Sequence, residues 1–190
     1  MMNRNAIVNL GRTFLVTVLL AGGGMSLQAE EAEAGQLKAG AFAFEYSKPW
    51  VKKASKSPMR AGELSYKFDE SQKLADVDAV FYYFGEGQGG GTEANIQRWI
   101  GQFDGTPKTE TEVVEINGTK VTFLTAAGTY LESAGPFAGK KTARPGSILL
   151  GAVIESEQGN VFVKLFGPEG SVEKVKVPFR TLVRSALEKN

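Results

Sequence analysis

The segment VVEINGTKVTFL, residues 113–124, is typical of an antiparallel β-hairpin. Two runs rich in β-branched residues flank Asn117 and Gly118. The Asn-Gly pair favours a type I′ turn, because both central residues of that turn take a positive φ. Residues 148–155 and 160–166 predict a second hairpin across a short polar turn. Because a hairpin joins antiparallel strands, the sequence predicts a mainly antiparallel sheet.

Residues outside these hairpins add strands and helices. Residues 41–46 alternate aromatic with other side chains, residues 59–68 place apolar side chains in phase, and residues 78–84 (DAVFYYF) are aromatic and β-branched. Each of these segments predicts a strand. Apolar residues recur at helical spacing over residues 93–103 and again over residues 172–187. The patterns predict an α+β fold in which helices pack on a mainly antiparallel sheet.

Three local features refine this prediction. Trp99 lies on the apolar stripe of the first helix and is predicted to be a core residue. The Gly-, Pro- and Lys-rich residues 131–147 predict a loop. Pro178 interrupts the C-terminal pattern, so that helix is predicted either to kink at Pro178 or to begin there.

Composition limits the chemistry that the chain can perform. It has 190 residues, with 22 Lys and Arg, 21 Asp and Glu, and neither Cys nor His. This excludes thiolate nucleophiles, Ser-His-Asp triads, zinc sites with nitrogen or sulfur ligands, and iron–sulfur clusters. A near-neutral chain offers no electrostatic footprint for nucleic acid. We therefore expect no nucleic-acid partner, no metal site and no cofactor.

The N-terminal residues have the features of a secretory signal peptide. Arg4 and Arg12 supply a positive region, residues 13–21 (TFLVTVLLA) are apolar, and residues 27–29 form an acceptable cleavage tripeptide. An uncleaved membrane anchor is the alternative, but the apolar run is shorter than the roughly 20 residues that span a bilayer. We predict cleavage after Ala29, a periplasmic or secreted location, and no stable membrane insertion after cleavage.

The domain organisation follows from this signal. Residues 1–29 are the signal peptide, residues 30–39 are predicted to be an acidic, Ala-rich tether, and residues 40–190 a single α+β domain. A domain of this size buries roughly 68–70% of its unfolded surface. Such a core needs no covalent staples, which accounts for an exported chain without disulfides.

A glycine-rich loop, GEGQGGG at residues 85–91, separates a predicted strand from a predicted helix. It contains a formal GxGxxG, whose glycines let backbone N–H groups approach a phosphate at a helix N-terminus. Against dinucleotide binding, the sheet is not predicted to be parallel, and no acidic residue ends a strand about 20 positions later. Thr92 is predicted to cap the helix. The candidate ligand-binding residues are Gly87, Gln88, Gly89, Gly90, Thr92, Asn95 and Arg98.

One face of the predicted helix is polar, since Asn95, Arg98 and Gln102 are spaced i, i+3 and i+7. In a structural interpretation, Arg98 pairs with a carboxylate of the sheet and Asn95 satisfies carbonyls of the glycine loop. The alternative is a polar stripe that faces a ligand.

A second polar feature is the basic run at residues 48–60. It contains Lys48, Lys52, Lys53, Lys56 and Arg60 and no acid. The run is interpreted as a solvated loop, with a docking patch as the alternative.

Several motifs carry a resemblance to known proteins. They are residues 81–85 (FYYFG), 88–90 (QGG), 95–99 (NIQRW), 102–103 (QF), 128–130 (GTY), 151–154 (GAVI) and 163–168 (VKLFGP). This set resembles a group of uncharacterised exported bacterial proteins with an aromatic strand, a Gly-Gly loop and an Asn-x-x-Arg-Trp-x-x-Gln-Phe helix. In its element order the group is similar to the PsbP-like fold, an antiparallel sheet sandwiched by helices. The resemblance implies no reaction and no photosystem role.

The leading hypothesis is an exported, non-enzymatic domain that binds an unidentified protein or small ligand, or associates with the envelope. One alternative is a hydrolase of an exported substrate that uses carboxylates, Lys or Ser, which would require a buried Lys or Glu with a displaced pKa. Another is a purely structural envelope component. A pocket with convergent polar groups near residues 87–95 would favour binding.

Overall fold

The computed structural model describes residues 34–55, 57–133 and 141–188. All of them belong to the unit Glu31–Asn190, whereas the unit Met1–Glu30, with the predicted signal peptide, lies outside the described residues. In chain order the elements are β1 (Gly35–Ala39), β2 (Phe42–Tyr46), β3 (Trp50–Lys53), β4 (Gly62–Tyr66), the 3-10 helix η1 (Glu70–Gln72), β5 (Val77–Tyr83), α1 (Thr92–Ile100), β6 (Phe103–Ile116), β7 (Thr119–Ser133), β8 (Lys141–Ile154), β9 (Val161–Pro168) and α2 (Glu169–Ser185).

Seven of the strands form one sheet in the order β3-β4-β5-β9-β8-β7-β6, and all neighbours in it are antiparallel. Both predicted hairpins, β6–β7 and β8–β9, belong to this sheet. Asn117 and Gly118 join the first pair with φ values of 49° and 78°, as a type I′ turn requires. β1 and β2 pair separately. The predicted α+β class is therefore confirmed.

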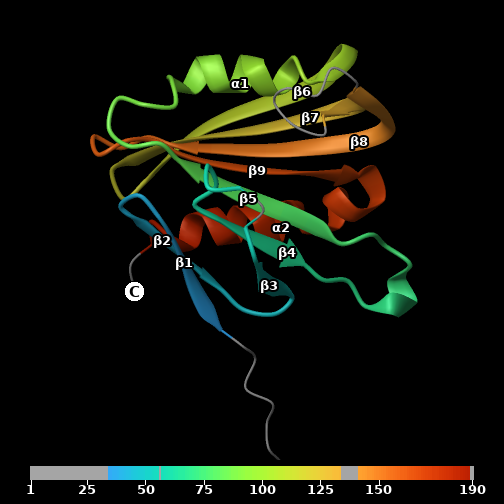
Figure 1. The fold of residues 1–190 in the computed structure, drawn as a ribbon, viewed down its shortest axis with the longest axis horizontal. Helices are drawn as coiled ribbons and strands as arrows, with labels where there is room; N and C mark the ends of the chain where they lie inside the picture. The colour runs from blue at the N-terminus through green and yellow to red at the C-terminus, as the bar shows by residue number, and fades with distance from the viewer. Residues whose placement is uncertain (1–33, 56, 134–140, 189–190) are drawn as a thin grey trace, which may run out of the picture. The chain divides into compact units, whose positions relative to one another are not determined.

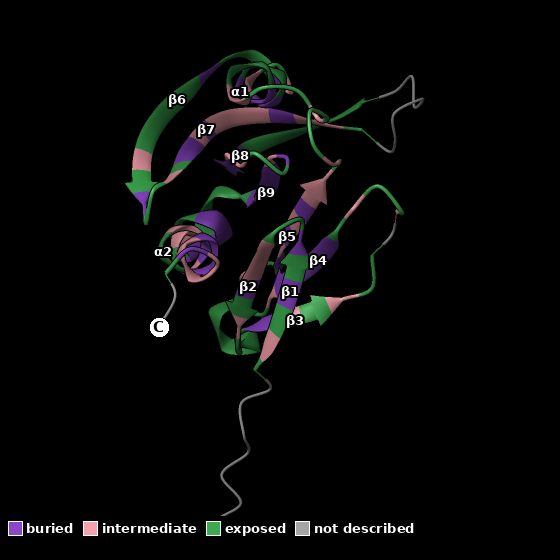
Figure 2. Cartoon of the chain, turned by 90° about the vertical axis from the view of Figure 1, so that its left-hand side faces the viewer, coloured by how far each residue is buried: buried purple, intermediate pink, exposed green. Residues whose placement is uncertain are grey.

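The helices lie on opposite faces of the sheet (Figures 1 and 2). On one face, α2 and the β1–β2 hairpin bury apolar side chains together with the strands. Phe44 of β2 packs edge-on against Phe81 of β5, with ring centroids 4.8 Å apart. On this side α2 contributes Val172, Val175, Phe179, Leu182 and Val183.

On the other face, α1 packs mainly against β6, β7 and β8. The predicted core residue Trp99 is buried there, 5% exposed. Its ring lies directly on Gly151, where a Cβ would come within 2.4 Å of the indole. Gly151 therefore allows the helix to approach the sheet, because any side chain would occupy the place of the ring.

The predicted tether is wrong for residues 35–39, which form β1. Leu37 and Ala39 are buried, 3% and 2% exposed, and alternate with exposed Gln36 and Lys38. Leu37 fits over Gly62 of β4, where a Cβ would lie 2.7 Å from its Cδ1. Two apolar positions in a short strand are a weak periodic signal, so the acidic, Ala-rich composition dominated the prediction.

The predicted loop at residues 131–147 is also wrong at both of its ends, and residues 134–140 lie outside the described residues. β7 continues to Ser133 and β8 begins at Lys141, with Leu131 opposite Ala143. Backbone pairing and the Glu132–Arg144 ion pair, 2.9 Å, hold this exposed extension without an apolar pattern.

Helix boundaries differ from prediction as well. α1 ends at Ile100, and Phe103 is the first residue of β6, although it is buried as expected. α2 begins at Glu169 and runs through Pro178, so the helix does not begin at that proline.

Candidate functional site

The glycine loop, residues 85–91, connects β5 to α1 as predicted. Gly87, Gly89 and Gly90 have φ values of 66°, 82° and 80°, a region that favours glycine. Gly87 and Gln88 are exposed. Gly89 is packed: a Cβ on it would lie 2.7 Å from Phe84 and 2.8 Å from Phe162. The loop thus needs its glycines both for backbone conformation and for close packing.

Asn95 ties this loop to α1. Its side chain is 3% exposed and donates hydrogen bonds to the carbonyls of Gly89, 2.9 Å, and Gly91, 3.0 Å. Its Oδ1 accepts a hydrogen bond from Arg98 at 2.9 Å. The structural interpretation of Asn95 is therefore confirmed, because its amide is used within the protein.

Arg98 and Thr92 make different contacts from those expected. Within the described residues, no carboxylate lies at ion-pair distance from Arg98, so the expected pair with the sheet is wrong. Gly91, not Thr92, is the N-cap of α1. The Thr92 hydroxyl donates to Glu155 at 2.7 Å, a contact that lowers the pKa of that carboxyl. Residues 89–98 thus form a structural brace, and their role in ligand binding stays a prediction.

A second polar region lies beside α1 on the same face of the sheet. α1 packs mainly on β6–β8, and in the described chain the part of this face formed by β3, β4, β5 and the stretch of β9 around Lys164 lies beside the helix. We call this region the helix-free half and define it by Lys53, Glu63, Asp78, Tyr82, Lys164 and Phe166.

Lys164 is the most unusual residue of the helix-free half. It lies on the central strand β9, and its ammonium donates to Gln102 Oε1 and to the Tyr130 hydroxyl, 2.8 Å away. The Tyr130 hydroxyl in turn donates to Gln102 at 2.9 Å. The ammonium also lies 5.2 Å from the centre of the Tyr130 ring. Among the described residues, no carboxylate forms an ion pair with Lys164.

This environment changes the protonation of both groups. Burial, followed by the nearby charge of Arg60, lowers the pKa of Lys164 from 10.5 to about 8. Burial raises the pKa of Tyr130 from 10.0 to about 12. The phenol therefore stays protonated at neutral pH, and Lys164 keeps its charge against an unfavourable environment.

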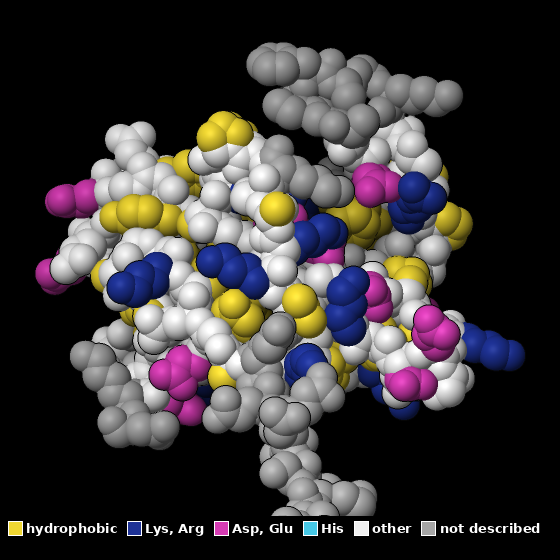
Figure 3. All heavy atoms as spheres, turned by 60° about the horizontal axis from the view of Figure 1, so that its bottom comes forward, with side chains coloured by type: hydrophobic (Ala, Val, Ile, Leu, Met, Phe, Trp, Pro, Cys, Tyr) yellow, Lys and Arg dark blue, Asp and Glu magenta, His cyan; other side chains and the backbone are white. Residues whose placement is uncertain are grey.

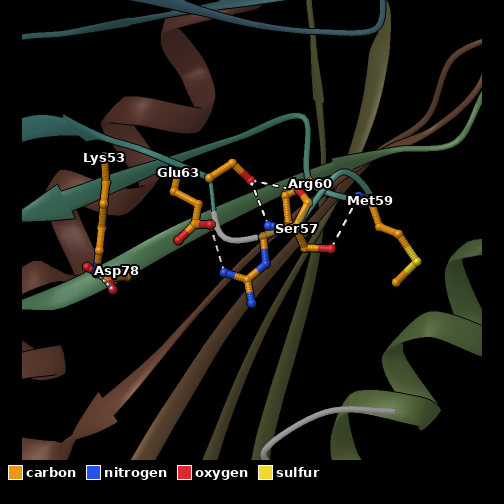
Figure 4. A network of polar contacts seen from close by, with 7 residues as sticks. Lys53, Ser57, Met59, Arg60, Glu63 and Asp78 are labelled. Atoms are coloured by element: carbon orange, nitrogen blue, oxygen red, sulfur yellow. Dashed lines mark hydrogen bonds and ion pairs between the residues drawn. The ribbon is translucent and has the colours of Figure 1, made fainter. Parts of the chain in front are cut away.

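Two ion pairs lie on the β3–β5 side of β9, the strand that carries Lys164. Arg60 contacts the Glu63 carboxylate at 2.8 Å, and Glu63 is only 1% exposed. Lys53 pairs with Asp78 on the neighbouring strands. Figure 4 shows Arg60 reaching toward Glu63 and Lys53 toward Asp78 over the strands.

Tyr82 links Arg60 to the centre of the helix-free half. Burial disfavours the charge of Arg60, but contacts with Glu63 and Tyr82 leave its pKa raised. Burial likewise raises the pKa of Tyr82. The docking-patch alternative for the basic run is thus not needed for Lys53 and Arg60, since both have carboxylate partners.

Aromatic rings border these charges. Tyr82 and Phe84 stack with centroids 6.2 Å apart, and Phe84 is 43% exposed. Tyr130 and Phe166 stack at 4.3 Å beside the Lys164 ammonium. The region therefore offers one uncompensated cation next to accessible aromatic surface, a combination that suits a small organic ligand.

Elsewhere the charges are balanced. The face seen in Figure 3 carries basic and acidic side chains interspersed, with hydrophobic side chains between them. No group of three or more acidic residues in the described parts of the chain is arranged to hold a metal ion. Neither α1 nor α2, the helices that the structure describes, has the length and apolar character to cross a membrane.

Lys164, Glu63 and Tyr82 were not predicted as site residues from the sequence. The signal was a charged residue inside an otherwise apolar strand: Lys164 in VFVKLF and Glu63 in GELSY. Gln102 was noted on the polar side of the helix, but its partners Tyr130 and Lys164 come from distant strands. Their convergence depends on strand order, which the sequence pattern does not contain.

Comparisons with known proteins support the fold. No protein-family model matches the chain, and no curated protein sequence matches it. The solution structure of cyanobacterial PsbP from Synechocystis sp. PCC 6803 is similar with a TM-score of 0.51 and 15% identity, over 88% of this chain and 96% of that chain. A Pseudomonas aeruginosa protein of unknown function, described as a putative regulator, gives a TM-score of 0.43 and 10% identity, over 83% of this chain and 98% of that chain. The chain thus has a PsbP-like fold.

Proposed function

We propose that this chain is an exported, non-enzymatic binding domain whose ligand occupies the helix-free half. The observation that carries the proposal is the position of Lys164: a partly buried ammonium with two neutral partners, Gln102 and Tyr130, and no ion-pair partner among the described residues. Desolvating a charge without a counter-ion costs free energy. In proteins, ionisable groups in such unfavourable environments occur mainly at sites that bind a ligand or catalyse a reaction.

The location of the site supports binding as well. Polar groups that converge beside aromatic rings are typical of ligand sites. On this proposal, the glycine loop and Asn95 contribute indirectly. Gly89 packs on Phe84 and so positions one of the exposed rings at the edge of the helix-free half.

Mapping small aromatic fragments onto the protein tests this function. Backbone amide NMR shifts are recorded while neutral and charged fragments are added. We expect shifts to concentrate at Val80, Lys164 and Phe166, with none at Val113, an exposed residue of the edge strand β6. If no fragment perturbs the helix-free half, the proposed site is wrong.

A hydrolase that uses Lys164 is the second candidate, because a lowered pKa is what a lysine base or nucleophile requires. Its contacts favour binding over catalysis. No serine among the described residues makes a hydrogen bond to Lys164, so a Ser-Lys pair is not assembled. Hydrolysis of ester substrates by the wild-type chain, lost in Lys164→Met, would support the enzyme instead.

Export is part of the proposal and rests on the N-terminal sequence alone. Mass spectrometry of the protein recovered from the periplasm or medium should give a mature chain that begins at Glu30. An intact N-terminus in the membrane fraction would overturn the localisation.

A further inference from the structure

We propose that the helix-free half binds an aromatic carboxylate, whose acid group is held by Lys164 and Arg60 and whose ring packs against Tyr82 and Phe84. The inference rests on the proposed function and names its ligand class. Three features of the site lead to it: the balance of charge, the exposed ring of Phe84 stacked on Tyr82, and the hydrogen bonds that fix the Lys164 ammonium.

The charge balance calls for one anion. Lys53 has Asp78 and Arg60 has Glu63, but Lys164 has only uncharged oxygens. Arg60 lies near enough to Lys164 for its charge to disfavour the ammonium. A carboxylate bound beside both cations would offset this repulsion and replace the hydration that Lys164 has lost. One carboxylate is enough, because the other charges are already compensated.

The rings call for a flat ligand. Tyr82 of β5 and Phe84, which follows the end of that strand, stack with an angle of 18° between their planes. Phe84 is 43% exposed, although most large apolar side chains among the described residues are buried. A planar ring packs well on such a surface, since stacked and edge-to-face contacts add to apolar burial. A short aliphatic acid would satisfy Lys164 but leave this surface in water.

Tyr130 and Gln102 hold the Lys164 ammonium that would bind the carboxylate. Tyr130 of β7 and Gln102, which lies between α1 and β6, both accept hydrogen bonds from Lys164 and fix the position of its ammonium. Gln102 Oε1 accepts from both Lys164 and Tyr130, which fixes the amide. The ammonium retains a proton for an incoming oxygen, because it has three donors and two partners.

The test compares matched probes in NMR titrations of the full chain. Benzoate should bind at the helix-free half, whereas benzamide, its neutral counterpart, and acetate, which lacks the ring, should each bind at least about tenfold more weakly. Lys164→Met should weaken benzoate about tenfold or more and leave benzamide unchanged. Lys176→Met is the matched control, because Lys176 lies on α2, on the opposite face of the sheet, and has its own carboxylate partner in Glu173, so this variant should bind benzoate like the wild type.

A pH series gives an independent readout. With a pKa of about 8 for Lys164, the protonated fraction falls about tenfold between pH 7 and pH 9, and benzoate affinity should fall with it. Among the other groups that face Lys164, Arg60 and the phenols of Tyr82 and Tyr130 have raised pKa values, about 12 for Tyr130, so they do not change charge in this range. Lys164→Met should remove the pH dependence, and thermal unfolding of each variant verifies that it is folded.

The outcomes separate the two proposals. If benzamide binds as well as benzoate, the site is only an apolar surface. The proposal that the ligand carries a carboxylate is then wrong, but the proposed function stands. If acetate binds as tightly as benzoate, the proposal that the ligand has an aromatic ring is wrong. If Lys164→Met is folded and binds benzoate normally, the assignment of Lys164 is overturned. If none of the probes perturbs this face, the proposed function itself fails.

Discussion

A row of residues that are paired across neighbouring strands runs through both halves of the sheet face that carries α1. The backbone pairing is the same in the two halves, but the side chains differ. From β3 to β7 the row reads Lys53, Glu63, Val80, Lys164, Gly151 and Leu124. Under α1, the row has a glycine and a leucine, so the helix can approach and exclude water. Beyond α1, the same row has charges. The sheet thus provides one scaffold, and the side chains of neighbouring strands decide where it is closed by a helix.

The difference also separates two roles. The covered half gains stability through apolar burial by Trp99. In the helix-free half, Lys164 keeps a charge that its surroundings disfavour. Substitutions in the first half should therefore change folding, and substitutions in the second should mainly change binding.

Removal of the Trp99 ring should have the largest effect on stability. Trp99→Ala is expected to lower the free energy of unfolding by about 3–5 kcal/mol, because the buried ring leaves a cavity over Gly151. Denaturant unfolding measures the change. Val113→Ala is the control, since Val113 is 57% exposed and its loss should cost less than about 0.5 kcal/mol. Equal effects of the two variants would show that α1 adds little to the fold.

A side chain at Gly151, the sheet residue that Trp99 packs on, should lower stability by a smaller amount. Gly151→Ala places a methyl group within 2.4 Å of the indole and is expected to cost about 1–3 kcal/mol through overpacking. Gly91→Ala is the matched control, because Gly91 has a φ of −75° and a Cβ there meets nothing within 4 Å. A Gly151→Ala variant as stable as the control would mean that α1 shifts without cost.

Sequence reasoning recovered one of these halves better than the other. The covered half rests on local patterns: the helical spacing around Trp99 and the Asn-Gly hairpin. Both were predicted, as was the contact of Asn95 with loop carbonyls. The helix-free half depends on β9 lying between β5 and β8, a long-range arrangement that brings Lys164 to Tyr130 and Arg60. Local periodicity carries no information on strand order, so those contacts could not be predicted.

The charge of Lys164 should make stability depend on pH. The pKa of Lys164 falls from 10.5 in the unfolded chain to about 8 in the folded one, so the unfolded chain binds more protons between pH 8 and pH 10.5. The free energy of unfolding therefore rises with pH across that window, and below about pH 8 the penalty is present in full. Between pH 7.5 and pH 10, the wild type should gain on the order of 1–2 kcal/mol relative to Lys164→Met, after allowance for solvent screening.

The comparison of the wild type with Lys164→Met is informative only up to about pH 10. Burial raises the pKa of Tyr130 to about 12, so ionisation of this phenol in the unfolded chain lowers stability above about pH 10. Urea unfolding below pH 10 isolates Lys164. Parallel pH profiles of the wild type and Lys164→Met would show that the ammonium is not desolvated, and the two halves of the face would then differ less than their contacts indicate.

The smallest effects are expected at the glycine loop, which borders both halves. Gly87 is exposed with a φ of 66°, so Gly87→Ala should cost about 1 kcal/mol through backbone strain alone. Because the Asn95 amide already binds the carbonyls of Gly89 and Gly91, the loop is fixed by its own contacts and needs no anion. For the wild type, the melting temperature should therefore be the same in phosphate, sulfate and chloride at matched ionic strength. The same independence of the anion is expected for Gly87→Ala, at that variant's own melting temperature. A rise with phosphate or sulfate that Gly87→Ala abolishes would restore the loop as an anion site and move the binding function from Lys164 to the N-terminus of α1.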